Sequence, residues 1–251
     1  MEYINRHIED TLKSCSKNFK AVLLTGARQT GKSTLFRHMF PDVKEVTFDD
    51  PFVEEQARTN PDMFMMLNEP PVFLDEIQYV PSLFRYIKMS CDNHEDKGLY
   101  YLSGSQPFKL MDMVSDSLAG RIAIVEMAPL SLREIMNSNC KKPFLPTMEY
   151  VKERNKDAKN PGNIWKIIHR GGYPEMQNPE LDWGLYFSSY IKTYLERDIR
   201  ELAAVQDLDT FRRFMIACAA RTGEMLNYSN IAEEIVKDAD TVKKWISILE
   251  A

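Results

Sequence analysis

The sequence predicts an α/β fold, a parallel five-stranded sheet with helices on both faces, followed by an all-helical region. Between residues 21 and 126, short apolar runs alternate with stretches of helical periodicity. This alternation is typical of βαβ units, in which each strand is buried on both sides. Beyond residue 137 the sequence has helical periodicity but no convincing strand pattern, so we expect the sheet to be complete before that point.

The elements of the first half can be placed one by one from their apolar spacing. Residues 2–14 have apolar positions four apart, which predicts an amphipathic helix. Residues 21–25 (AVLLT) predict a buried strand that enters a glycine-rich turn, and residues 33–40 predict the helix after that turn. The further strands are expected at residues 45–48, 72–74, 99–102 and 122–126.

A polar, proline-containing stretch divides the two halves. Residues 138–162 are rich in Lys and Asn, and we interpret them as a connector with one short helix. The predicted organisation is therefore an α/β domain over residues 1–137, this connector, a helical region over residues 163–225, and a final segment over residues 226–251.

The composition excludes several classes of protein. The chain of 251 residues is 44% hydrophobic with a formal net charge of −5, so it is not a general polyanion binder, and DNA contact would need a local basic patch. Its four cysteines lie far apart, which indicates reduced thiols and neither disulfides nor a zinc site. No apolar run approaches the ~18 residues of a membrane span, and the N-terminal residues lack the apolar core of a signal peptide. We therefore expect a cytoplasmic protein with no membrane partner.

A glycine-rich loop follows the first expected strand. It reads GARQTGKS and matches GxxxxGK[ST] in full, between a strand and a helix as this motif requires. Glycines let the backbone wrap a phosphate group, so that successive N–H groups and the helix N-terminus point at it. Lys32 would reach the β- and γ-phosphates, and the Ser33 hydroxyl would ligate Mg²⁺. The predicted nucleotide-binding residues are Gly26, Ala27, Arg28, Gln29, Thr30, Gly31, Lys32, Ser33 and Thr34.

Two carboxylates end the expected strand at residues 72–74. We predict that Asp75, with Ser33, holds Mg²⁺, and that Glu76 polarises the attacking water as a general base. An acidic base directly after the magnesium Asp is the arrangement of ATPases with an extra strand between the loop strand and the Asp strand. A guanine-binding NKxD motif is not formed, because Ala158 stands where its Asp would be. ATP is therefore favoured over GTP.

Three further residues are candidates for catalysis, each with a structural alternative. Ser105 and Gln106 follow the strand at residues 99–102, where ATPases of this kind carry a polar group that touches the γ-phosphate or the attacking water; Ser105 could equally cap a helix. Arg121 precedes the last strand, where its guanidinium could reach the γ-phosphate of a neighbouring subunit or simply form a salt bridge. The predicted catalytic residues are Lys32, Glu76, Ser105, Gln106 and Arg121.

Seven segments together identify a family. GARQTGKST, FLDEIQ, LSGSQ, SLAGRI, PLSLREI, GGYPE and YIKTYLERDI occur in this order, and from Ile4 to Ala251 the chain resembles the prokaryotic AAA+-superfamily predicted ATPases that carry a C-terminal domain of unknown function. The resemblance implies an AAA+ P-loop core, a helical region, a winged-helix-like segment and a further C-terminal region. Family members continue past the final LEA, so we expect residues 226–251 to be a partial, truncated winged helix.

The end of the chain has the pattern of two short helices. Residues 228–235, with Ser229 as a plausible N-cap, and residues 241–249 each have an apolar face. Two such helices around a tight turn form the core of a helix-turn-helix. Neighbouring acids offset the lysines here, which favours a protein partner over DNA. A truncated winged helix also predicts uncovered apolar surface, with Trp245 or Ile248 exposed or packed on another chain.

These features predict an Mg²⁺-dependent ATP-binding protein that hydrolyses ATP to ADP and phosphate and couples its nucleotide state to the helical region. The alternatives are a slow nucleotide-gated regulatory or DNA-binding switch and, less favoured, a small-molecule kinase, since Glu76 is placed for water and no Arg-rich lid is seen in the sequence. The expected partners are further copies of this chain or another protein.

Overall fold

The computed structural model describes residues 3–105, 110, 118–138, 142, 144–195 and 208–250. The chain divides into two compact units, Met1–Leu181 and Asp182–Ala251. This division falls inside the predicted helical region, residues 163–225. Gln106, a predicted catalytic residue, lies outside the described residues.

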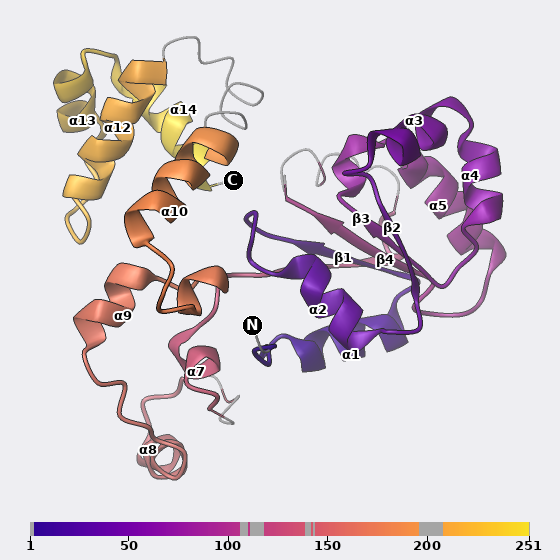
Figure 1. The fold of residues 1–251 in the computed structure, drawn as a ribbon, viewed down its shortest axis with the longest axis horizontal. Helices are drawn as coiled ribbons and strands as arrows, with labels where there is room; N and C mark the ends of the chain where they lie inside the picture. The colour runs from indigo at the N-terminus through magenta and orange to yellow at the C-terminus, as the bar shows by residue number, and fades with distance from the viewer. Residues whose placement is uncertain are drawn as a thin grey trace. The chain divides into compact units, whose positions relative to one another are not determined.

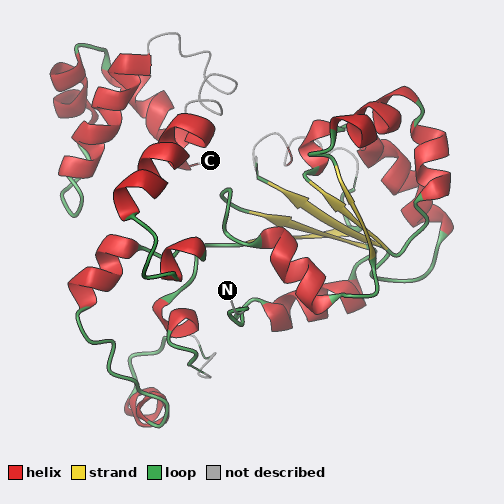
Figure 2. Cartoon of the chain, in the orientation of Figure 1, coloured by secondary structure: helices red, strands yellow, loops and turns green. Residues whose placement is uncertain are grey.

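The first unit contains a parallel five-stranded sheet, as predicted (Figure 2). Its strand order is β2-β3-β4-β1-β5. The strand β4 lies between β1, which precedes the glycine-rich loop, and β3, which ends in Asp75, so the expected extra strand is present. The strands are β1 (Ala21–Thr25), β2 (Lys44–Thr47), β3 (Val72–Asp75), β4 (Tyr100–Gly104) and β5 (Ile122–Glu126).

Helices cover both faces of this sheet, because alternate residues of its buried strands point to opposite sides. Leu23 contributes to a core cluster on the face of α3, α4 and α5, whereas Val22 and Leu24 contribute to a second cluster on the face of α1 and α2 (Figure 1). These helices are α1 (Glu9–Asn18), α2 (Lys32–Met39), α3 (Pro51–Thr59), α4 (Pro61–Leu67) and α5 (Leu83–Asn93).

Short helices make up the rest of the first unit. They are the 3₁₀ turns η1 (Ile77–Tyr79) and η2 (Glu175–Gln177) and the helices α7 (Leu132–Ile135), α8 (Met148–Asn155) and α9 (Ile164–Arg170). The helix α7 begins with a capping box, in which the Ser131 hydroxyl accepts from Glu134 N–H and the Glu134 carboxylate accepts from Ser131 N–H. The same carboxylate accepts from Arg6, whose guanidinium also donates to Thr30 of the glycine-rich loop.

The described residues of the second unit form helices joined by short turns and contain no strand. It comprises α10 (Trp183–Tyr190), the π-helical turn η3 (Ile191–Leu195), α12 (Leu208–Ala220), α13 (Tyr228–Ile235) and α14 (Ala239–Glu250). None of the helices described in either unit is long and apolar enough to cross a bilayer.

Trp245 or Ile248 is expected from the sequence to be exposed or packed on another chain, and for Trp245 this expectation is wrong. Trp245 on α14 is only 7% exposed, and its ring packs on Phe211 and Phe214 of α12, with centroid distances of 5.1 and 5.3 Å. Ile248 is half-buried against the same cluster. The physical reason is that α12 covers the apolar faces of α13 and α14, so three helices share one core.

Candidate nucleotide-binding site

The glycine-rich loop joins β1 to α2 at the carboxyl edge of the sheet. Its backbone takes left-handed φ values at Gly26 (139°), Gln29 (60°) and Gly31 (93°). A Cβ on Gly26 would lie 2.3 Å from the Met127 carbonyl oxygen, so only glycine allows the loop to pass this close to the end of β5. The loop therefore has the tight curvature that lets backbone N–H groups face one concave side.

Lys32 begins α2 and folds over the loop. Its Nζ donates to the carbonyl oxygens of Gly26 and Ala27, each at 2.9 Å. Burial lowers the pKa of this amine from its ordinary value, and the nearby carboxylates of Asp75 and Glu76 oppose that shift. The predicted phosphate-binding lysine thus contacts the glycine-rich loop directly.

Ser33 and Asp75, the two predicted magnesium ligands, are in direct contact. Ser33 Oγ donates to the Asp75 carboxylate at 2.8 and 2.9 Å, and Ser103 Oγ donates to the same group from β4. Asp75 is buried, which raises its pKa, although the two hydroxyl donors act in the opposite direction. Hydroxyl and carboxylate oxygens are hard ligands of the kind Mg²⁺ takes, so the donor set fits this ion.

Glu76 lies next to this pair in a left-handed conformation, φ 56°, which is unusual for a residue with a side chain. Its carboxylate accepts from Ser105 Oγ at 3.1 Å and from Gln78 Nε2. The Gln78 Oε1 atom is buried and has no hydrogen-bond partner within the described part of the chain. Ser105 therefore lies beside the predicted base, and Gln78 is a contact that the sequence motifs did not indicate.

The sequence ranks Ser103 below Ser105 and Gln106 as a candidate, because it falls at the end of the expected strand. The structure places it in β4, with its Oγ donating to Asp75. β3 and β4 are in register with Val72 opposite Tyr100, so the residue three places further on each strand, Asp75 and Ser103, lies at the same level. The predicted strand starts, residues 72 and 99, would have paired Asp75 with Leu102, because β4 begins one residue later than predicted.

Arg121 lies at the opposite, amino edge of the sheet. Its carbonyl oxygen accepts from Lys20 N–H and Ala21 N–H at the start of β1, and its Nε donates to Asp92 at 2.5 Å. Within one chain, Arg121 therefore forms a salt bridge, which is one of the two alternatives that the sequence left open. A role on a neighbouring subunit's phosphate stays a prediction.

Comparisons with known proteins agree with the loop and the sheet. Residues 18–136 match the model of a family described as AAA domain, and residues 162–251 match one described as Domain of unknown function (DUF8612). Two curated proteins, "Uncharacterized protein Rv2008c" of Mycobacterium tuberculosis and "Uncharacterized protein Mb2031c" of Mycobacterium bovis, are each 26% identical over 231 residues, 91% of this chain and 47% of theirs. The chain thus spans about half the length of the curated relatives it matches.

Among solved structures, the Walker-type ATPase PABY2304 of Pyrococcus abyssi has the same fold, with a TM-score of 0.55 at 18% identity over 99% of this chain and 89% of that one. The resemblance read from the motifs is confirmed by these matches. Residues 18–136 are therefore similar to AAA domains, and residues 162–251 are similar to a domain of unknown function.

Proposed function

We propose that this chain binds ATP with Mg²⁺ at residues 26–34 and hydrolyses it to ADP and phosphate. The observation that carries the proposal is the contact of Ser33 with Asp75, directly beside Glu76, at the edge of the sheet where the glycine-rich loop lies. Parallel α/β sheets bind ligands at this carboxyl edge, where the strand order reverses.

Each residue has a distinct task in this proposal. Loop N–H groups and Lys32 bind the phosphates, which requires the Lys32 amine to leave the carbonyls of Gly26 and Ala27. Ser33 and Asp75 would hold Mg²⁺, which when bound neutralises charge on the phosphate oxygens. The Glu76 carboxylate takes a proton from water, and Ser105 orients that carboxylate.

A Glu76→Gln variant tests the base. It should bind ATP as the wild type does, and its rate of phosphate release should fall by ~10² or more, because the carboxylate acts on water and not on the nucleotide. Binding is measured by calorimetry and turnover by phosphate release, with and without EDTA. Glu95→Gln, at an exposed carboxylate, is the matched control. Unchanged turnover in the Glu76 variant would remove this residue from the mechanism.

A slow nucleotide-gated switch is the second candidate. It is favoured by two hydrogen bonds to the Oε2 atom of Glu76, donated by Gln78 and Ser105. These bonds must rearrange if Oε2 is to accept a proton from water. Turnover of ~1 s⁻¹ or more without any added acceptor would support the ATPase. Stable binding of unhydrolysed ATP would support the switch.

A further inference from the structure

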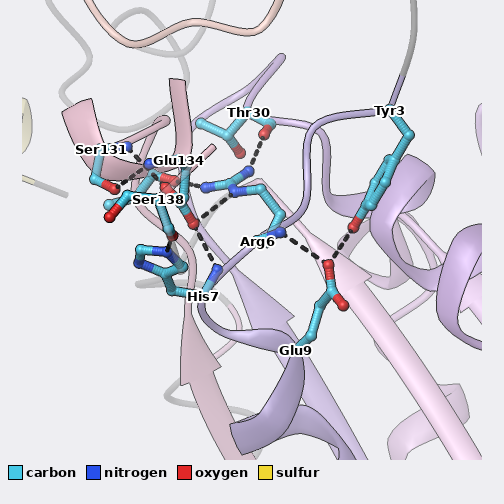
Figure 3. A network of polar contacts seen from close by, with 9 residues as sticks. Tyr3, Arg6, His7, Glu9, Thr30, Ser131, Glu134 and Ser138 are labelled. Carbon is cyan, nitrogen blue, oxygen red and sulfur yellow. Dashed lines mark hydrogen bonds and ion pairs between the residues drawn. The ribbon is translucent and has the colours of Figure 1, made fainter. Parts of the chain in front are cut away.

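Arg6 is a buried arginine that joins three segments far apart in the sequence (Figure 3). It lies before the matched AAA domain, in none of the motifs above, and is only 6% exposed. Its Nη1 donates to Thr30 O of the glycine-rich loop at 3.0 Å, and its Nη2 donates to Ala128 O, just after β5, at 2.6 Å. Its Nε donates to Glu134 Oε1 of α7 at 3.2 Å.

The contact with Thr30 determines how one peptide unit of the loop faces. The Thr30 carbonyl and the Gly31 N–H belong to the same planar trans peptide, so they point in opposite directions. A donor that holds the carbonyl on one side therefore presents the N–H on the other. Gly31 has φ 93°, in a region that glycine enters and leaves at little cost. Without an anchor, this peptide can therefore turn at little cost.

The guanidinium is itself held in place by a fixed acceptor. Glu134 Oε1 also accepts from His7 N–H at 2.8 Å, and Glu134 Oε2 accepts from Ser131 N–H at 2.7 Å. A planar guanidinium can address three acceptors in fixed directions, which a lysine ammonium on a flexible stem cannot reproduce. The cation behind the Thr30 carbonyl also polarises the peptide and strengthens its N–H as a donor.

We propose that Arg6 is a positioning residue for the phosphate-binding loop, which holds the Thr30–Gly31 peptide so that the Gly31 N–H faces the phosphates of a bound nucleotide. The inference rests on the proposed nucleotide binding. It assigns to Arg6 a part of the affinity for nucleotide and no part in the chemical step, because its guanidinium contacts Thr30, Ala128 and Glu134. Asp75 and Glu76 lie at the end of β3 and contact other side chains.

The test compares Arg6→Lys and Arg6→Ala with Glu134→Gln in the full chain. Calorimetric titration with ADP and Mg²⁺ gives the affinity without any need for hydrolysis. Both Arg6 variants should bind ADP about tenfold or more weakly, as expected for a lost hydrogen bond between charged and polar groups. In Glu134→Gln, Arg6 can still donate to Thr30, and glutamine also serves at this position of a capping box. The ADP affinity of this variant should therefore stay within about threefold of the wild type, a much smaller change than in the Arg6 variants.

Steady-state phosphate release separates positioning from unfolding. A loosened loop raises KM and leaves kcat at saturation nearly unchanged, whereas partial unfolding removes active protein and lowers kcat at constant KM. Wild-type ADP affinity in both Arg6 variants, or an equal loss in Glu134→Gln, would overturn the inference and leave Arg6 as a simple anchor of the N-terminal segment. If the wild type bound ADP no better than Lys32→Ala, the proposed function itself would fail, and the inference with it.

Discussion

At the scale of single residues, Glu134 shows how one carboxylate connects the N-terminal segment to α7. Burial raises its pKa, but the N–H donors of Ser131 and His7 and the charge of Arg6 outweigh burial and lower the pKa below its ordinary value of 4.5. The ionised form is therefore the one that the folded chain prefers. The carboxylate accepts hydrogen bonds from Arg6, His7 and Ser131, so its titration should affect the stability of the fold.

This shift predicts how the stability difference between wild type and Glu134→Gln changes with pH. The folded pKa lies below the unfolded one, so the unfolded chain binds more protons as pH falls, and the stability contributed by the carboxylate is lost. The wild type should be more stable than the variant at neutral pH, and the gap should narrow below the ordinary pKa of 4.5. Urea unfolding of both proteins across this range measures it, with Glu95→Gln as the exposed control. A gap that is the same at all pH values would contradict the assignment.

Which site residues the sequence reveals depends on whether their partners are contiguous in the chain. Lys32, Ser33 and the Asp75–Glu76 pair belong to local motifs whose spacing reports the chemistry directly. Arg6 lies in no such motif, because its role depends on which distant atoms it reaches after folding. Gln78 ends the FLDEIQ segment, but the segment alone did not indicate its contacts with Glu76 and Ser105. A buried Arg6 that contacts Thr30, 24 residues away, cannot be read from local periodicity.

At the scale of elements, the segment from α9 to η2 packs directly against the phosphate-binding loop. The Pro174 Cγ atom lies 3.7 Å from where a Cβ on Gly31 would be. Gln177 Nε2 donates to the carbonyls of Gly171 and Tyr173, each at 3.1 Å, and closes the turn. The GGYPE motif thus has a structural role beside the loop, which its sequence alone did not indicate.

Gly172 permits this packing, which leads to a prediction. The Gly172 carbonyl accepts from Leu130 N–H at 2.6 Å, and a Cβ on Gly172 would lie 2.4 Å from Leu130 O. Gly172→Ala must push the two backbones apart and should lower the free energy of unfolding by about 1–3 kcal/mol. Gly184→Ala, on the helix α10, is the control. Its Cβ would meet only a side-chain atom, Asp182 Oδ1 at 3.3 Å, so the substitution should change stability by no more than about 0.5 kcal/mol. Equal transitions in urea for Gly172→Ala and wild type would show that the contact is not tight.

The strands and their buried faces were predictable because parallel βαβ units leave continuous apolar runs in the sequence. The strand positions agree with the structure to within a residue or two at their ends. The cover of α13 and α14 was not predictable in the same way. The sequence pattern predicts that the two helices leave an apolar face uncovered. The structure shows that Phe211 and Phe214 of α12 pack on Trp245 and cover that face.

At the scale of the whole molecule, the parallel sheet separates two edges with different chemistry. The carboxyl edge holds the phosphate-binding loop with Asp75 and Glu76, whereas Arg121 lies at the amino edge, where β5 begins. Because every strand of the sheet runs in the same direction, Arg121 cannot reach the loop of its own chain. A catalytic role for its guanidinium would therefore need a second copy of the chain.

This geometry predicts concentration-dependent catalysis if Arg121 acts on a neighbouring subunit. The turnover per chain should rise with protein concentration, and Arg121→Ala should lower it while leaving ADP affinity unchanged, because the loop of each chain stays intact. Mixing Arg121→Ala with Glu76→Gln should restore part of the activity, since one chain then supplies the arginine and the other the base. Asp92→Ala removes only the ion-pair partner, so it should not lower turnover. A wild-type rate that is independent of concentration, with no recovery on mixing, would leave Arg121 as the ion-paired residue at the start of β5.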